Sequence, residues 1–169
     1  MIEDRDYLSR VEEVAIFPGA VAALQRLSNA GFLLFLVTNQ SGVGRGYFTM
    51  TDVEDVHRHL LAELARDDVH FRKIYIAPEA PDQPSYGRKP SPKFLFDARD
   101  EFGIHLAESF MIGDKWIDLE CGWNAGVKQS ILVRTGYGAE VERAQRNQLR
   151  QAVVMDNLAA AADLILSAS

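Results

Sequence analysis

Four short polar segments of this sequence combine side chains that can bind an anion and a metal ion. The segments are Thr38-Asn39-Gln40, Arg88-Lys89, Gly113-Asp114-Lys115 and Arg134-Thr135-Gly136. Hydroxyl, lysine and arginine groups donate hydrogen bonds to phosphate oxygens. A glycine-rich loop from Gly42 to Gly46 lets backbone amides approach an anion closely. These residue types together predict a phosphate-binding site.

Asp114 and Asp118 place negative charge beside this predicted anion site. A shared Mg²⁺ ion is the usual reason for a carboxylate next to a phosphate group, because Mg²⁺ takes few carboxylates together with water and substrate phosphate. The pattern therefore favours phosphoryl chemistry on a small phosphorylated molecule.

The polar segments follow apolar runs that predict β-strands. The predicted strands cover residues 32–37, 74–77, 109–112 and 130–133, with a weaker edge strand at 152–155. Helices are predicted at about 18–31, 91–102, 116–124, 139–148 and 158–166, and a further helix begins after Thr51 or Thr49 and ends at about residue 65. This alternation predicts an α/β fold, a three-layer Rossmann-like parallel sheet with helices on both faces. Because the carboxyl ends of parallel strands share one edge, we expect the polar segments on one rim, where such sheets bind ligands.

Composition narrows the class of protein. A chain of 169 residues predicts one domain, residues 1–169, and a formal net charge of −6 argues against broad binding to nucleic acid or anionic lipid. The single cysteine, Cys121, excludes an internal disulfide and a multi-cysteine zinc site. No apolar run reaches the roughly 18 residues of a membrane span, and the charged start lacks the pattern of a signal peptide. We therefore expect a cytoplasmic protein with no membrane partner.

Three motifs resemble those of the haloacid dehalogenase superfamily of phosphatases. They are Thr38-Asn39-Gln40-Ser41-Gly42, Arg88-Lys89-Pro90 and Gly113-Asp114-Lys115-x-x-Asp118, which are similar to the second, third and fourth motifs of that family. The resemblance runs from Tyr7 to Gly136 and is greatest to the branch of D-glycero-D-manno-heptose 1,7-bisphosphate and histidinol-phosphate phosphatases. It implies a Mg²⁺-dependent phosphatase of a small phosphorylated metabolite, such as the heptose bisphosphate, with a minimal cap and a monomeric state.

The resemblance also implies roles for individual residues. Thr38 and Lys89 would act in catalysis by binding the transferred phosphoryl group, and Asp114 would ligate Mg²⁺ with Asp118 ordering the metal shell. The remaining residues predicted to bind substrate or phosphate are Asn39, Gln40, Arg45, Arg88 and Arg134.

The N-terminus departs from the family pattern. The family's nucleophile and general acid lie in an Asp-x-Asp-Gly-Thr signature that ends a central strand, roughly 40 residues before the motif threonine. Here Asp4-Arg5-Asp6 is followed by Tyr7-Leu8, and counting back from Thr38 passes Met1. We therefore predict that the chain lacks its first strand, which would lie between strands 32–37 and 109–112, and is inactive as given. A start codon assigned too late, a shortened chain or a catalytically dead protein would each explain this pattern.

A second departure concerns zinc. Many relatives carry a Cys/His cluster before Arg-Lys-Pro, but residues 77–87 hold neither cysteine nor histidine. We therefore expect no structural zinc.

Alternative functions remain open. The Thr38–Gly46 stretch also resembles polynucleotide 3′-phosphatase domains, which lack zinc. The net charge of −6 counts against this function. Histidinol phosphate is another possible substrate, and a non-catalytic phosphate-binding or interaction protein is the alternative outside enzymes. His57 and His59 point apart on a helix and are expected at the surface, whereas Cys121 is expected to fill the core.

Overall fold

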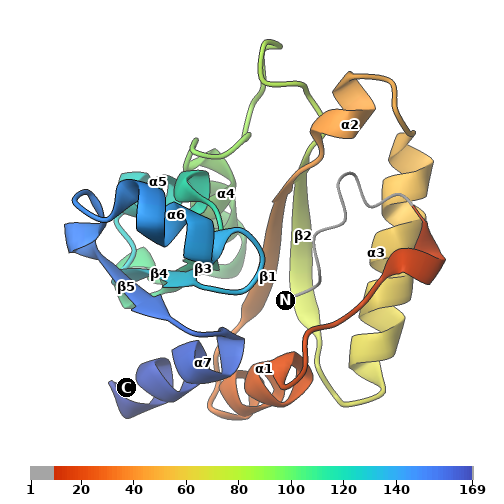
Figure 1. The fold of residues 1–169 in the computed structure, drawn as a ribbon. Coiled ribbons are helices and arrows are strands. Elements are labelled where there is room, and N and C mark those ends of the chain that lie inside the picture. Colours follow the sequence, from red (N-terminus) through yellow and green to blue (C-terminus); the bar gives the residue numbers. More distant parts are fainter. Residues whose placement is uncertain (1–9, 169) are drawn as a thin grey trace. The chain divides into compact units, whose positions relative to one another are not determined.

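The computed structural model describes residues 10–168, so Asp4-Arg5-Asp6 and Tyr7-Leu8 lie outside the described residues. The chain divides into two units, one of Met1–Arg88 with Ala162–Ser169 and one of Lys89–Ala161 (Figure 1). The single domain expected for residues 1–169 stays a prediction.

The first unit contains two parallel strands. A 3₁₀ turn at Val11–Glu13 leads to α1 (Ala20–Asn29), β1 (Leu34–Asn39), α2 (Ser41–Gly44), α3 (Met50–Ala65) and β2 (Phe71–Ala77). The register places Thr38 opposite Ile76 and Asn39 opposite Ala77, so the last residues of the two strands end level with each other. The loops that follow β1 and β2 therefore begin side by side.

The helices of the first unit bury apolar faces. In α1 the buried residues Ala20, Ala23, Leu24 and Leu27 recur at helical spacing. A capping box begins α3, since the Thr49 hydroxyl accepts from the Asp52 amide and the Asp52 carboxylate accepts from the Thr49 amide. The Thr49 amide and the Thr49 hydroxyl, which both donate to the Asp52 carboxylate, hold the pKa of Asp52 below its ordinary value. The helix α3 also buries His57, which is only 8% exposed, so the expected surface position of His57 is wrong.

The second unit contains three parallel strands in the order β3-β4-β5. Its elements are α4 (Lys93–Phe102), a 3₁₀ turn at Leu106–Glu108, β3 (Phe110–Gly113), α5 (Trp116–Ala125), β4 (Gln129–Val133), α6 (Gly138–Gln145), a 3₁₀ turn at Leu149–Gln151 and β5 (Ala152–Met155). The final helix, α7 (Leu158–Ser167), begins in this unit and ends in the first.

The core of the second unit forms where α5 packs on β3 and β4. Leu119 of α5 and Leu132 of β4 are fully buried and lie in one apolar cluster with Leu149. The buried Ser130 hydroxyl donates to the Leu119 carbonyl at 3.1 Å, which satisfies its hydrogen-bonding need inside the core. This packing fixes the ends of β3 and β4, from which the second group of candidate site residues begins.

The α/β architecture with parallel strands is confirmed, with differences at the ends of strands. We expected Thr38 and Asn39 to follow the first strand, but they belong to β1 because its pairing with β2 continues to Asn39. The strand β2 begins three residues before the predicted start, at Phe71, and residues expected to form an open glycine loop form the short helix α2. These differences arise because strand ends are set by pairing between distant segments, which apolar periodicity does not report.

In the described part of the chain, β1 pairs with β2 and β3 with β4, and no strand joins the two sheets. The predicted loss of a central strand concerns residues outside this part and stays a prediction. None of the helices formed by residues 10–168 is both long and apolar enough to cross a membrane.

Candidate phosphate and metal site

The end of β1 presents Thr38 and its neighbours. The Gln40 side chain donates to the Thr38 hydroxyl oxygen at 3.2 Å, and the Gln40 backbone amide donates to the Ala77 carbonyl at 2.7 Å. Because the Thr38 oxygen accepts this bond, its own hydrogen is left to donate to a ligand. The arrangement suits a hydroxyl that binds a phosphoryl oxygen.

Arg88 is held in the loop that follows β2. Its Nη1 atom donates to the Glu79 carbonyl at 2.8 Å, and its backbone amide donates to the Ser85 hydroxyl at 3.2 Å. The Ser85 hydroxyl in turn donates to the Glu79 carboxylate at 2.6 Å. Glu79 and Ser85, which sequence reasoning missed, therefore fix the position of Arg88.

Lys89 forms a buried ion pair with Asp118. The Lys89 ammonium lies 2.6 Å from one Asp118 carboxylate oxygen, and the two side chains are only 11% and 6% exposed. The other Asp118 oxygen accepts from the Lys115 backbone amide at 3.0 Å. Both oxygens of Asp118 are therefore engaged in positioning Lys89 and the start of α5.

Gly113 explains why Asp118 can reach this position. A Cβ atom at Gly113 would lie 2.3 Å from the Asp118 Cβ and 2.4 Å from its carboxylate. Any larger residue at the end of β3 would displace Asp118 and, with it, the partner of Lys89. The glycine of the Gly-Asp motif is thus required by close packing.

Asp114 lies beside a turn that follows β4. Its Oδ2 atom accepts from the Tyr137 backbone amide at 3.0 Å, and a Cβ atom at Gly136 would lie 2.3 Å from the same oxygen. Within residues 10–168, Oδ1 of Asp114 has no hydrogen-bond partner, so it is available to a cation. These residues contain no group of three or more His, Cys, Asp or Glu side chains that could hold a metal, so Asp114 would need water or a ligand's oxygen as further ligands.

Arg134 is engaged by two carboxylates. Its Nε and Nη2 atoms donate to Glu142 at 2.7 and 2.8 Å, and Nη1 donates to Asp156. The bond to Glu142, then that to Asp156, raises the pKa of Arg134, while Arg134 lowers the pKa of Glu142. Phosphate binding by Arg134 stays a prediction, and it would require these bonds to break.

The predicted site residues thus form two groups, one in each unit. Thr38, Asn39, Gln40, Arg45 and Arg88 belong to the first unit, and Lys89, Asp114, Asp118 and Arg134 belong to the second. Sequence reasoning also missed Tyr137, whose backbone holds Asp114 and whose ring lies 4.6 Å from the Lys115 ammonium. The adjoining Gly136, at a φ of +64°, was the signal that could have indicated a close approach there.

Known proteins are similar to this chain over most of its length. The D-glycero-D-manno-heptose-1,7-bisphosphate 7-phosphatase of Chlorobaculum tepidum is 42% identical over 146 residues, which cover 79% of this chain and 73% of that protein. The chain belongs to the haloacid dehalogenase superfamily. Within this superfamily it lies in the branch of the heptose bisphosphate phosphatases. The Escherichia coli K12 member of that branch is 36% identical to this chain, and the match covers 79% of this chain and 73% of the Escherichia coli protein.

Further comparisons agree with membership of this superfamily. A family model described as "HAD-hyrolase-like" matches residues 86–161, which include Lys89, Asp114 and Asp118. The crystal structure of D,D-heptose 1,7-bisphosphate phosphatase from B. bronchiseptica, complexed with magnesium and phosphate, matches with a TM-score of 0.91 and 30% identity. The match covers 99% of this chain and 93% of the B. bronchiseptica chain. The Burkholderia thailandensis enzyme matches with a TM-score of 0.71 and 29% identity, over 97% and 96% of the two chains. The Rossmann-like fold and the family predicted from the motifs are confirmed.

Proposed function

We propose that this chain carries the phosphate- and metal-binding parts of a Mg²⁺-dependent phosphatase for a small phosphorylated sugar. The observation that carries the proposal is the buried Lys89–Asp118 pair, which presents a fixed ammonium beside the motif that holds Asp114. A lysine held in this way is a compact positive charge for phosphoryl oxygens. D-glycero-D-manno-heptose 1,7-bisphosphate is the substrate favoured, because it is named for relatives that are 36–42% identical.

We propose for the individual residues the roles that the family resemblance implies. Thr38 donates its hydroxyl hydrogen to the transferred phosphoryl group, and Asn39 and Gln40 support the loop that presents it. Lys89 stabilises charge on the equatorial phosphoryl oxygens. Arg45 and Arg88 bind the rest of the substrate.

Asp114 fits a role as Mg²⁺ ligand, since its Oδ2 atom is anchored by Tyr137 and its Oδ1 atom faces no other donor in the described part of the chain. Bound Mg²⁺ would neutralise charge on the phosphoryl oxygens. Asp118 acts by positioning Lys89. Arg134 would bind phosphate only if its bonds to Glu142 and Asp156 broke.

The polypeptide of residues 1–169 is proposed to bind this substrate without hydrolysing it. Its only Asp-x-Asp sequence is Asp4-Arg5-Asp6, which is followed by Tyr7 in place of glycine. An aspartyl-phosphate route needs a nucleophile that this pattern does not supply. We further propose that the protein is a cytoplasmic monomer.

Calorimetric titration with the heptose bisphosphate in the presence of MgCl₂ tests this function. Lys89→Met should weaken binding roughly 30-fold, the equivalent of about 2 kcal/mol for a lost charge-assisted hydrogen bond. Lys128→Met, which removes an exposed lysine of the same unit, is the matched control and should bind like the wild type. Phosphate release should be undetectable for all three chains. Absence of binding by the wild type would refute the proposed substrate, and phosphate release by the wild type would refute the missing nucleophile.

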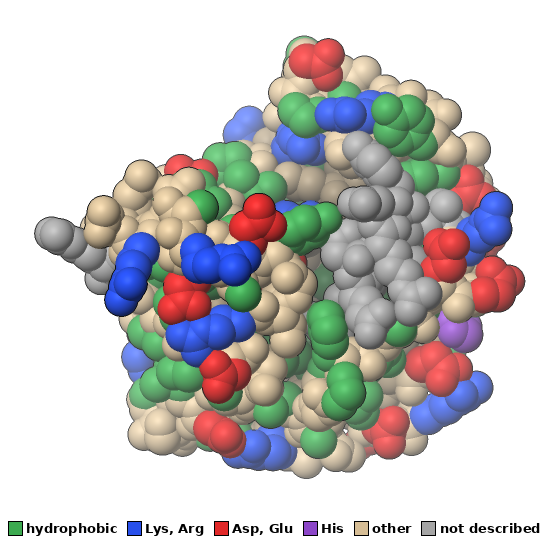
Figure 2. Space-filling model, viewed as in Figure 1, with side chains coloured by type: hydrophobic (Ala, Val, Ile, Leu, Met, Phe, Trp, Pro, Cys, Tyr) green, Lys and Arg blue, Asp and Glu red, His purple; other side chains and the backbone are tan. Residues whose placement is uncertain are grey.

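The same titration with histidinol phosphate and with 3′-phosphorylated DNA tests the alternatives. On the face shown in Figure 2, acidic and basic side chains are interspersed on each unit and form no continuous basic stripe. Because binding along a nucleic acid backbone needs such a stripe, we expect the DNA to bind more weakly than the sugar bisphosphate.

A further inference from the structure

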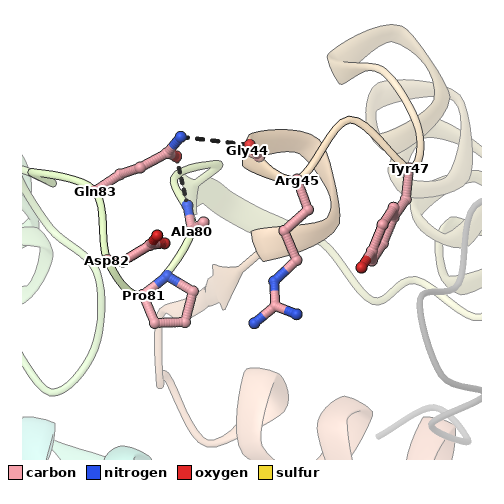
Figure 3. A pocket seen from close by; sticks show the side chains of 7 residues that line it. All are labelled: Gly44, Arg45, Tyr47, Ala80, Pro81, Asp82 and Gln83. Carbon is pink, nitrogen blue, oxygen red and sulfur yellow. Dashed lines mark hydrogen bonds between the residues drawn. The ribbon is translucent and has the colours of Figure 1, made fainter.

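A polar cavity that is wide open to solvent lies in the first unit, between the segment after β1 and the loop after β2. It has a volume of about 510 Å³ and is lined by Gly44, Arg45, Tyr47, Pro81, Asp82 and Gln83. Figure 3 shows the Arg45 side chain extending between Pro81 on one wall and Tyr47 on the other. This volume lies within the range of cavities that hold small molecules.

The two walls of this cavity are tied together by the Gln83 side chain. Its carboxamide oxygen accepts from the Ala80 backbone amide at 2.8 Å, and its nitrogen donates to the Gly44 carbonyl at 3.4 Å (Figure 3). A backbone bond from the Gly44 amide to the Pro78 carbonyl, at 2.8 Å, joins the same two segments. Gln83 is therefore the side chain that connects the wall carrying Arg45 to the wall carrying Asp82.

We call the two hydrogen bonds of the Gln83 side chain, to Ala80 and to Gly44, the clamp. The bond to Ala80 is the stronger of the two. Ala80 is only 4% exposed, and a buried backbone amide without a partner is costly. The glutamine oxygen supplies that partner. The longer bond to Gly44 is weaker but fixes which way the carboxamide faces.

Gly44 shows how closely the two walls approach. A Cβ atom at Gly44 would lie 2.4 Å from the Ala80 backbone nitrogen and 2.5 Å from the Gln83 side-chain oxygen. Because the first of these atoms belongs to the backbone, it cannot move aside as the end of a flexible side chain could. The width of the cavity is thus set by direct contact at Gly44 and by the Gln83 clamp.

We propose that Gln83 is a positioning residue whose clamp sets the width of a subsite in which Arg45 and Asp82 receive the hydroxylated, anionic part of a substrate away from its transferred phosphoryl group. The Arg45 guanidinium is a donor for a second phosphate, and the Asp82 carboxylate is an acceptor for sugar hydroxyls. This inference builds on the proposed function, since it assigns the sugar bisphosphate's second end to this cavity.

Hydrogen exchange at the Ala80 amide tests the clamp without any ligand. The wild type should protect this amide, and Gln83→Met, which has a similar length but no acceptor, should speed its exchange about tenfold or more. Gln83→Glu keeps an acceptor oxygen and should keep the protection. Gln148→Met, at an exposed glutamine of the second unit, should leave the Ala80 amide unchanged. Equal exchange in the wild type and Gln83→Met would overturn the clamp.

Binding of two ligands tests the subsite. Gln83→Met should weaken the heptose 1,7-bisphosphate about tenfold, as expected for loss of one to two hydrogen bonds, and change the affinity for inorganic phosphate by less than about twofold. An equal loss for both ligands would show a merely structural role and overturn the subsite, as would no loss for either. If the wild type binds inorganic phosphate but not the bisphosphate, the subsite and the assigned sugar are both wrong. If it binds neither, the proposed function fails, and the exchange result alone decides whether the clamp exists.

Discussion

Asp118→Asn removes the negative charge that holds Lys89 and keeps the size of the side chain. Lys89 and Asp118 are 11% and 6% exposed and lie 2.6 Å apart, so either charge left alone would be poorly hydrated. Breaking a buried ion pair from one side costs about 3 kcal/mol of the free energy of unfolding. We expect that cost for Lys89→Met, and a cost of about 2 kcal/mol for Asp118→Asn, because the long lysine can turn toward solvent.

The double variant Lys89→Met/Asp118→Asn should cost about 1 kcal/mol, far less than the sum of the two single changes. It leaves no unpaired charge, and the asparagine oxygen still accepts from the Lys115 amide. The difference between the double variant and the summed single variants measures the coupling between the two residues.

Urea unfolding followed by tryptophan fluorescence measures the stability of the second unit, which contains Lys89 and Asp118. The chain has two tryptophans, Trp116 and Trp123, which both lie in the second unit and pack edge to face at 5.3 Å. The exposed Arg99–Asp100 pair is a matched control, and Asp100→Asn should leave the unfolding midpoint unchanged.

Two results would refute this reasoning. Additive losses in the double variant would show that Lys89 and Asp118 do not depend on each other. Recovery of phosphate binding together with stability in the double variant would show that the Lys89 ammonium is not needed for the anion. We expect stability to recover while phosphate binding stays lost.

Three further predictions concern single residues. Gly136→Ala should lower both stability and Mg²⁺-dependent phosphate binding, because the new Cβ meets Asp114. Gly126 has a similar positive φ with open space around it, so Gly126→Ala should lower stability alone. Thermal melting measures the stability of both variants, and calorimetry measures their phosphate binding. Burial lowers the pKa of His57 below 6.5, so only the unfolded chain gains this proton at first as the pH falls. Stability should therefore drop below about pH 6.5, and His57→Gln should reduce that drop in circular dichroism melts. Burial raises the pKa of Cys121 to about 11, so iodoacetamide at about pH 8 should label it, by mass spectrometry, only after unfolding in urea.

Local patterns account for most of the fold that could be predicted. Apolar runs and helix signals predicted each strand that residues 10–168 form and their long helices, because side-chain periodicity is a property of neighbouring residues. They misplaced the ends of β1 and β2, where pairing such as Asn39 with Ala77 decides how far a strand extends. They also placed His57 at the surface, since a helix pattern does not show which side chains its neighbours cover.

The sequence by itself determined the family, because Thr38, Lys89 and Asp114 stand in short motifs, and it predicted the chemistry of these residues. Only the tertiary structure decided what each side chain contacts. In the folded chain, one oxygen of Asp118 pairs with Lys89 and the other accepts from the Lys115 amide. Arg134 donates to carboxylates that lie eight and 22 residues further along the sequence.

The tertiary structure also joined Gln83 to Gly44 across 39 residues and so created a cavity wall that no motif indicated. The physical reason is that hydrogen bonds and ion pairs between distant residues depend on how strands and loops pack. Spacing along the chain does not encode those distances.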